Sequence, residues 1–254
     1  MPGRLPACRP SRGCDKPGAT IGWAILARSV LCLLLAVIAG CADSNPPMDN
    51  SRASAIRYLA LGDSYTIGES VAESERWPNQ LASVLRQSGK NVADPTIIAR
   101  TGWTTDELSK AIDDAAPAAS WDLVSLLIGV NNQYRGRDAE QYRKEFVVLL
   151  RRAIQLARGN AGRVVVVSIP DWGVTPFAKD RDRAKIAREI DLYNAINREE
   201  SQRLGVIYVD ITPVSREPDP DLVAGDGLHP SGKQYAAWTR LIAAKIPPMQ
   251  MGTP

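Results

Sequence analysis

Five short apolar runs that alternate with longer segments of helical periodicity constrain the fold of this chain more than any other feature. The runs are IRYLALG (56–62), TIIAR (96–100), DLVSLLIG (122–129), RVVVVSI (163–169) and VIYVD (206–210). Helical spacing of apolar residues follows them near 77–87, 105–115, 139–157, 185–203 and 232–244. This alternation predicts an α/β fold with a central five-stranded parallel sheet and helices on both faces, a three-layer α/β/α sandwich.

In such a sheet, ligands bind in the crevice outside the carboxyl ends of the strands. Residues that directly follow each apolar run are therefore the candidates for chemistry. No internal repeat or second module is visible, so residues 55–247 are expected to form one domain, followed by a short tail at 248–254.

The first run ends in Gly62-Asp63-Ser64. Glycine permits a tight turn from strand to helix, and a serine at the start of the helix lies where backbone N–H groups favour negative charge. Ser64 is thus well placed to attack a carbonyl. The commoner use of Asp63 and Ser64 would be to cap the helix, so the triplet alone decides little.

His229 is the only histidine in the chain, and it lies in the segment GDGLHPS (225–231) just before the last helical segment. Asp226 precedes it by three residues, close enough for a turn to bring the carboxylate to the ring. A serine nucleophile needs a base, and an imidazole base needs an acceptor that fixes its tautomer. Ser64, His229 and Asp226 supply these three roles, although a lone histidine is more often a structural residue.

These two motifs, Gly62-Asp63-Ser64 and Asp226-x-x-His229, resemble the first and last blocks of the SGNH/GDSL hydrolase superfamily. The resemblance implies a flavodoxin-like fold, a serine esterase activity and no cofactor. The chain also lacks the Gly-x-Ser-x-Gly motif of α/β-hydrolases, and a single histidine excludes a multi-histidine metal site.

The two middle blocks of the family also have counterparts. Gly102 stands in RTGWTT after the second run, and Asn131 stands in IGVNN after the third. The resemblance implies an oxyanion hole formed by the backbone N–H groups of Ser64 and Gly102 and by the side-chain amide of Asn131. One departure is visible, because Asn132 replaces the aspartate that usually follows the asparagine of this block.

The sequence therefore predicts an enzyme that hydrolyses carboxylic esters, of the acyl, acetyl or lysophospholipid type. Two alternatives stay open: an acyltransferase that uses the same residues, and a catalytically silent lipid-anchored binding protein. The substrate is expected to be a small-molecule, lipid or glycan ester, and the protein is expected to be a monomer. Aromatic residues that follow the motifs are candidates for the substrate pocket: Tyr65, Trp103, Tyr134 and Trp172.

Charge argues against a nucleic-acid partner. The formal charge of +3 comes from the residues before Cys41, and the remainder carries 26 basic and 27 acidic residues. All four cysteines lie within the first 41 residues, so the predicted domain has no thiol for a disulfide, a zinc site or a nucleophile.

The segment SVLCLLLAVIAG (29–40) follows Arg28 and a basic stretch, and polar residues follow it. This pattern is typical of a secretory signal peptide, predicted here at residues 1–40. Its end, Ile38-Ala39-Gly40-Cys41, resembles a bacterial lipobox, which implies a lipid on Cys41 and a location in the bacterial cell envelope. Residues 41–54 would be a flexible tether. An ordinary cleaved signal and an uncleaved anchor helix remain alternatives.

Overall fold

The structure is a computed structural model that describes residues 55–247. The signal peptide, the tether and the short tail predicted at 1–40, 41–54 and 248–254 lie outside the described residues, as does Cys41. No helix of the described part of the chain is both long and apolar enough to span a membrane.

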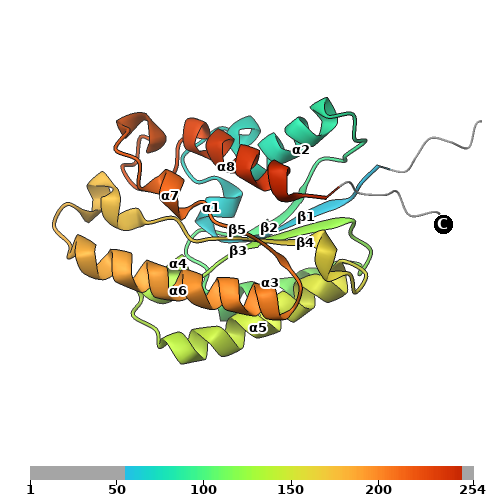
Figure 1. Ribbon diagram of the computed structural model, residues 1–254, viewed down its shortest axis with the longest axis horizontal. Helices are drawn as coiled ribbons and strands as arrows, with labels where there is room; N and C mark the ends of the chain where they lie inside the picture. Colours follow the sequence, from blue (N-terminus) through green and yellow to red (C-terminus); the bar gives the residue numbers. More distant parts are fainter. Residues whose placement is uncertain (1–54, 248–254) are drawn as a thin grey trace, which may run out of the picture. The chain divides into compact units, whose positions relative to one another are not determined.

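The described residues form a five-stranded sheet in which all neighbouring strands are parallel (Figure 1). The order across the sheet is β2-β1-β3-β4-β5. This order and the helices on both faces confirm the predicted α/β/α sandwich. The bounds of the strands are β1 Tyr58–Gly62, β2 Thr96–Ala99, β3 Leu123–Leu127, β4 Val164–Val167 and β5 Ile207–Val209.

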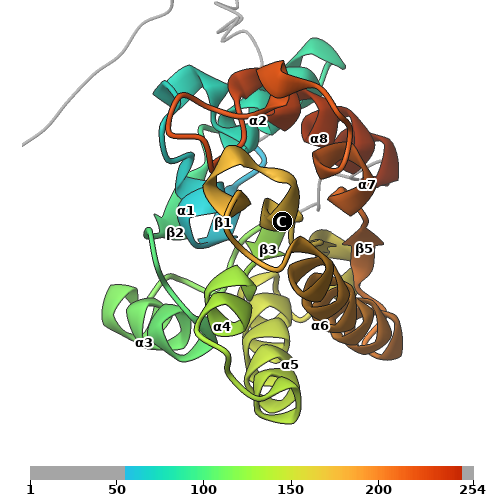
Figure 2. The same cartoon turned by 90° about the vertical axis from the view of Figure 1, so that its left-hand side faces the viewer.

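Helices cover both faces of the sheet, and Figure 2 shows the two groups on opposite sides of the strands. One face carries α1 (Ser64–Ile67), α2 (Trp77–Gln87), α7 (Thr212–Ser215) and α8 (Gly232–Lys245). The other face carries α3 (Thr105–Ala115), α4 (Val130–Tyr134), α5 (Ala139–Leu156) and α6 (Arg183–Arg203). Between residues 55 and 247, five single-turn 3₁₀ helices lie in the connections: Glu73–Glu75, Ala161–Arg163, Trp172–Val174, Pro176–Ala178 and Pro220–Leu222.

The predicted helix bounds agree with the structure to within about two residues, and side-chain caps account for the exact starts. Asp138 accepts a hydrogen bond from the N–H of Gln141 at 2.8 Å and begins α5 at the predicted residue. Asp182 accepts one from the N–H of Lys185 at 2.9 Å, so α6 begins two residues earlier than its apolar periodicity suggested.

Burial differs between the central and the edge strands. All residues of β1, β3 and β4 are buried, whereas β2 and β5 at the two edges are largely half-buried. This distribution explains why the central runs are nearly continuous apolar sequences. The largest fully buried side chains are Trp77, Trp238, Tyr58, Tyr142, Tyr235 and Phe146.

The strand order reverses between β1 and β3, and this point of the sheet is where a ligand site is expected. The chain moves from β1 to β2 on one side and then returns to β3 on the other side of β1. At the carboxyl ends of these two strands the connections diverge and leave a crevice. Ser64 follows β1 and Asn131 follows β3, so the topology brings residues from distant parts of the sequence to the same edge.

Candidate active site

Ser64 is the first residue of α1 and is only 5% exposed. The turn into this helix requires Gly62, because a Cβ there would lie 2.1 Å from Thr66 Oγ1 and 2.5 Å from the carbonyl oxygen of Leu127. Asp63 caps the helix by accepting a hydrogen bond from the N–H of Tyr65 at 3.1 Å. The N–H groups of Thr66 and Ile67 both donate to the carbonyl oxygen of Asp63 at 3.0 Å, so Asp63 caps this short helix with its backbone as well as with its carboxyl group.

The carboxyl group of Asp63 is completely buried, and its Oδ2 has no hydrogen-bond partner. This burial raises the pKa of Asp63 to about 7, although its backbone hydrogen bonds partly oppose the effect. Asp63 is therefore a structural cap and a titratable group directly beside Ser64.

His229 and Asp226 lie in the loop that precedes α8, and they are in direct contact. Nδ1 of His229 is 2.6 Å from Oδ2 of Asp226, while Oδ1 of Asp226 accepts hydrogen bonds from the N–H groups of Leu228 and His229, both at 2.9 Å. An antiparallel bridge between Val223 and Pro230 closes this loop. The three-residue spacing thus makes the turn that the sequence predicted.

Burial alone would raise the pKa of Asp226, but hydrogen bonds from Ser70, His229 and two backbone N–H groups outweigh it and hold the pKa well below its usual range. An ionised carboxylate only accepts hydrogen bonds, so Nδ1 of His229 must carry the proton. Nε2 of the neutral ring is then left as a proton acceptor. The imidazole itself is buried, with its side chain 10% exposed.

Gly102 and Asn131 approach the serine from the connections after β2 and β3. Gly102 has φ +88°, a conformation that favours glycine, and its carbonyl oxygen accepts a hydrogen bond from Arg135 at 2.7 Å. Asn131 lies in α4, and its Nδ2 donates to the carbonyl oxygen of Trp103 at 2.9 Å. An amide nitrogen carries two hydrogens, so one remains for a ligand.

Asn132, which departs from the family pattern, is completely buried and joins α4 to the start of α3. Its Oδ1 accepts from the N–H of Thr105 at 3.1 Å, and its Nδ2 donates to Thr105 Oγ1 at 2.7 Å. The hydroxyl of Thr105 in turn donates to Glu145. An aspartate could not donate to this hydroxyl, so the asparagine leaves the hydroxyl proton free for Glu145.

Ser64, Gly102, Asn131 and His229 line one cavity of about 210 Å³. Three of the four predicted pocket aromatics reach it: Tyr65, Tyr134 and Trp172. Trp103 does not, because its ring packs against the hydrophobic core and only its carbonyl contacts the site through Asn131. Sequence reasoning did not identify four further lining residues: Thr101, Val130, Phe177 and Leu228.

Aromatic side chains form the outer wall of this cavity. Trp172 is buried and contacts Tyr134 edge-on at 5.4 Å and Phe177 at 6.0 Å between ring centroids. Its indole N–H donates to Gln133 Oε1 at 2.8 Å, which fixes the ring. Tyr134 and Phe177 are 48% and 43% exposed, so the wall ends in a partly apolar rim at the surface.

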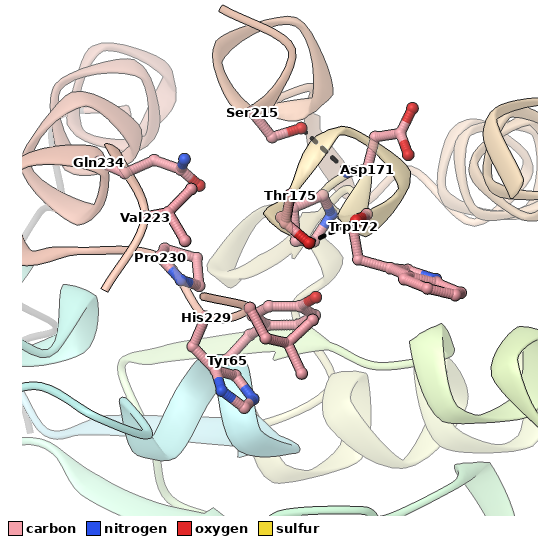
Figure 3. Close-up of a pocket in the computed structure, with 11 residues that line it drawn as sticks. Tyr65, Asp171, Trp172, Thr175, Ser215, Val223, His229, Pro230 and Gln234 are labelled. Atoms are coloured by element: carbon pink, nitrogen blue, oxygen red, sulfur yellow. Dashed lines mark hydrogen bonds between the residues drawn. The ribbon is translucent and has the colours of Figure 1, made fainter. Parts of the chain in front are cut away.

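A second cavity of about 10 Å³ adjoins the first and is shown in Figure 3. Both cavities are lined by Tyr65, Trp172, Leu228 and His229. The smaller one is at the lower limit of the space that a single water molecule needs. The ring of Tyr65 also contacts the imidazole edge-on, with centroids 5.7 Å apart, so His229 is packed against an aromatic ring as well as bonded to Asp226.

Within residues 55–247, no group of three or more His, Cys, Asp and Glu side chains is arranged to hold a metal ion. The residues that line the larger cavity include a serine, a histidine and an asparagine, together with Gly102. This set suits attack on a carbonyl and stabilisation of an oxyanion.

The family model of the GDSL-like Lipase/Acylhydrolase family matches residues 60–237. The match includes all four motifs and most of the chain. The protein therefore belongs to this family, a class of serine hydrolases that act on ester bonds. Comparison with curated proteins gives no match.

Several solved structures share the fold. The lipase/acylhydrolase from Enterococcus faecalis is 18% identical, with a TM-score of 0.60 over 78% of this chain and 100% of that chain. The acetylxylan esterase Axe2 from Geobacillus stearothermophilus is 18% identical, with a TM-score of 0.59 over 75% and 93%. The esterase EstA from Pseudoalteromonas sp. is 14% identical, with a TM-score of 0.58 over 75% and 96%. At such identities the likeness establishes the fold alone.

Proposed function

We propose that this protein hydrolyses carboxylic esters through a Ser64-His229-Asp226 triad. Ser64 Oγ attacks the ester carbonyl while Nε2 of His229 takes the hydroxyl proton. The same imidazole then protonates the leaving alcohol and a covalent acyl-serine forms. A water molecule, deprotonated by His229, attacks this intermediate, releases the carboxylic acid and restores the serine. Asp226 keeps the imidazole in the required tautomer throughout.

The negative charge on the carbonyl oxygen would be stabilised by the N–H groups of Ser64 and Gly102 and by the amide of Asn131. Such donors act strongly because they are oriented before the reaction begins. The observation that carries the proposal is the convergence of Ser64, Gly102, Asn131 and His229 on one cavity, with Asp226 bonded to the imidazole.

The shape of the cavity supports an acyl group longer than acetyl. Its volume of about 210 Å³ is many times the roughly 10–15 Å³ that a single water molecule needs, so it has room for several carbon atoms. Apolar side chains contribute much of the wall, among them Val130, Trp172, Phe177 and Leu228. Burying an acyl chain against them is favourable at roughly 0.8 kcal/mol per methylene. We therefore propose short- to medium-chain esters as preferred substrates.

The test is turnover of nitrophenyl acetate, butyrate, octanoate and palmitate by the full chain. Butyrate or octanoate should give the highest kcat/KM. Ser64→Ala and His229→Ala should abolish turnover, and Asn131→Ala should lower kcat by about 100- to 1000-fold through the loss of one oxyanion donor. Ser83→Ala, an exposed serine in α2, is the matched control and should retain full activity.

A covalent probe tests the nucleophile independently. EstA from Pseudoalteromonas sp. is described as inhibited by monoethylphosphonate. An activated ethylphosphonate should likewise add its phosphonyl mass to the peptide that contains Ser64, and to no peptide of the Ser64→Ala variant. Absence of both labelling and ester turnover would favour the binding-protein alternative. Transfer of acyl groups to added sugars in preference to water would favour the acyltransferase.

We further propose that the protein is exported and anchored in the cell envelope by a lipid on Cys41. The support is the apolar segment at 29–40 and the lipobox-like residues that precede this cysteine. Labelled palmitate should be incorporated into the wild-type chain but not into Cys41→Ala in a bacterial host. Equal incorporation would contradict the anchor.

A further inference from the structure

One hydrogen bond to the proposed triad comes from a distant part of the chain. Ser70 Oγ donates to Asp226 Oδ2 at 2.6 Å, across 156 residues of sequence. We propose that Ser70 is a positioning residue that fixes the Asp226 carboxylate, and through it the His229 ring. This inference rests on the proposed triad, because it assigns Ser70 a role through Asp226.

The acceptor sites of Asp226 show why one hydroxyl matters. Oδ1 accepts from the N–H groups of Leu228 and His229, and Oδ2 accepts from His229 Nδ1 and Ser70 Oγ. A carboxylate offers about four lone-pair sites, so these donors occupy all of them. Without Ser70, Oδ2 would be held only by the ring that it has to orient. Since the Asp226 side chain is 30% exposed, water could compete for the vacated site.

The backbone conformation of Ser70 is unusual and is compatible with a segment fixed by its contacts. It has φ +66°, the left-handed conformation that non-glycine residues rarely adopt. Such strain persists where the surrounding structure determines it, and it is concentrated at functional sites.

Neighbouring residues hold the Ser70 segment against both sides of the site. Glu69 accepts a hydrogen bond from Thr101, which lines the larger cavity next to Gly102. Further along, Gln80 donates to the carbonyl oxygen of Gly232 at the start of α8 at 3.1 Å. The segment after the nucleophile is therefore bonded to the oxyanion connection and to the helix that follows His229.

The central experiment compares Ser70→Gly with wild type. Glycine removes the hydroxyl but accepts the left-handed backbone, so the variant should fold with unchanged or higher Tm. We expect kcat for nitrophenyl butyrate to fall about tenfold, as for loss of a weak hydrogen bond to a charged group, with KM unchanged. Ser70→Asn tolerates the same backbone and offers an N–H donor, so it should recover part of the loss.

Ala116→Gly is the matched control, because Ala116 is exposed, has φ +40° and lies away from the site at the end of α3. It should keep wild-type kcat. The same Ser70→Gly substitution is also made in the Asp226→Asn variant. If Ser70 acts only through Asp226, kcat of the double variant should equal that of Asp226→Asn alone.

Two outcomes would overturn the inference in distinguishable ways. Wild-type kcat in Ser70→Gly, or an equal loss in the wild-type chain and in the Asp226→Asn variant, would overturn the role of Ser70 and leave the triad intact. Wild-type turnover in Asp226→Asn would overturn the proposed triad and the role of Ser70 together.

Discussion

The serine side of the site, residues 62–66, is built into the core, whereas the aspartate-histidine loop, residues 223–231, is mostly half-buried, with Gly225 and Asp226 exposed. Asp63 and Thr66 are completely buried, and Gly62 leaves no space for a side chain. Asp226 is exposed and is held by four hydrogen bonds. Packing therefore positions the nucleophile, whereas hydrogen bonds position the carboxylate of Asp226.

This difference separates stability from activity. Close packing resists small changes of volume, so substitutions on the serine side should destabilise the fold. Surface hydrogen bonds contribute little to stability, but they determine the orientation that catalysis needs. Substitutions in the loop should therefore lower kcat in a protein that still folds.

The largest effect is expected for Asp226→Asn. It would leave the imidazole in the wrong tautomer and should lower kcat by about 10,000-fold, while Tm falls less than in a variant of the core. Nitrophenyl butyrate kinetics and thermal unfolding measure the two quantities. Asp221→Asn, an exposed aspartate in the 3₁₀ helix just before this loop, is the control and should keep wild-type kcat. If Asp226→Asn lowered Tm as much as a substitution in the core does, the proposed contrast between the serine side and the aspartate-histidine loop would be wrong.

The second effect is on the pH dependence of stability. Because burial raises the pKa of Asp63 to about 7, the folded state keeps this proton while the unfolded state has lost it above about pH 4. Stability from this group is thus fully present below pH 4 and falls by roughly 4 kcal/mol as pH rises to 7. Urea unfolding of wild type and Asp63→Asn should differ by this slope, and parallel curves would contradict it.

The pKa of Asp226 shifts on folding in the opposite direction to that of Asp63, so the two regions differ in how their stability depends on pH. The pKa of Asp226 is lowered on folding, so its contribution to stability is present above the ordinary pKa of an aspartate and is lost as pH falls below it. Asp226 therefore adds no slope between about pH 5 and 7, where the Asp63 effect is measured.

Next in size is Gly62→Ala. Its Cβ would overlap Thr66 Oγ1 and the carbonyl oxygen of Leu127, both in the core. We expect a loss of about 3 kcal/mol in the free energy of unfolding, at the upper end for overpacking. Gly89→Ala provides a contrast, since that glycine has open space around it and suffers only from its φ of +84°. A stable Gly62→Ala would show that the turn can adjust.

The smallest effect concerns the rim, which belongs to neither region. Phe177→Ala should leave Tm and the turnover of nitrophenyl acetate unchanged. It should lower kcat/KM for nitrophenyl octanoate about fivefold, equivalent to about 1 kcal/mol of lost apolar contact. Val148→Ala, exposed on α5, is the matched control. Equal losses for both esters would mean that Phe177 does not contact the acyl chain.

Much of the fold was predictable because the periodicity of apolar residues is a local property of the sequence. The apolar runs gave all five strands, and caps such as Asp138 and Asp182 account for helix starts. The four motifs also indicated which residues meet at the site. Trp103 shows the limit of this prediction. Its position beside Gly102 was compatible with a place in the pocket or against the core, and in the structure its ring packs against the core.

Ser70 and Phe177 carried no signal in the sequence. Nothing near Ser70 marks a partner 156 residues away, and Phe177 follows a proline in a loop with no periodicity. Their positions depend on how the connections fold over the edge of the sheet. Such contacts arise from long-range packing, to which no local pattern refers.

The sequence by itself determined the layers, the parallel sheet and the motifs, because hydrophobic period and turn chemistry act over a few residues. Only the tertiary structure decided the strand order, and with it the meeting of Ser64, Gly102, Asn131 and His229 around one cavity. It also decided that Ser70 completes the bonds to Asp226. The physical reason is that contacts between distant segments depend on the packing of the whole domain.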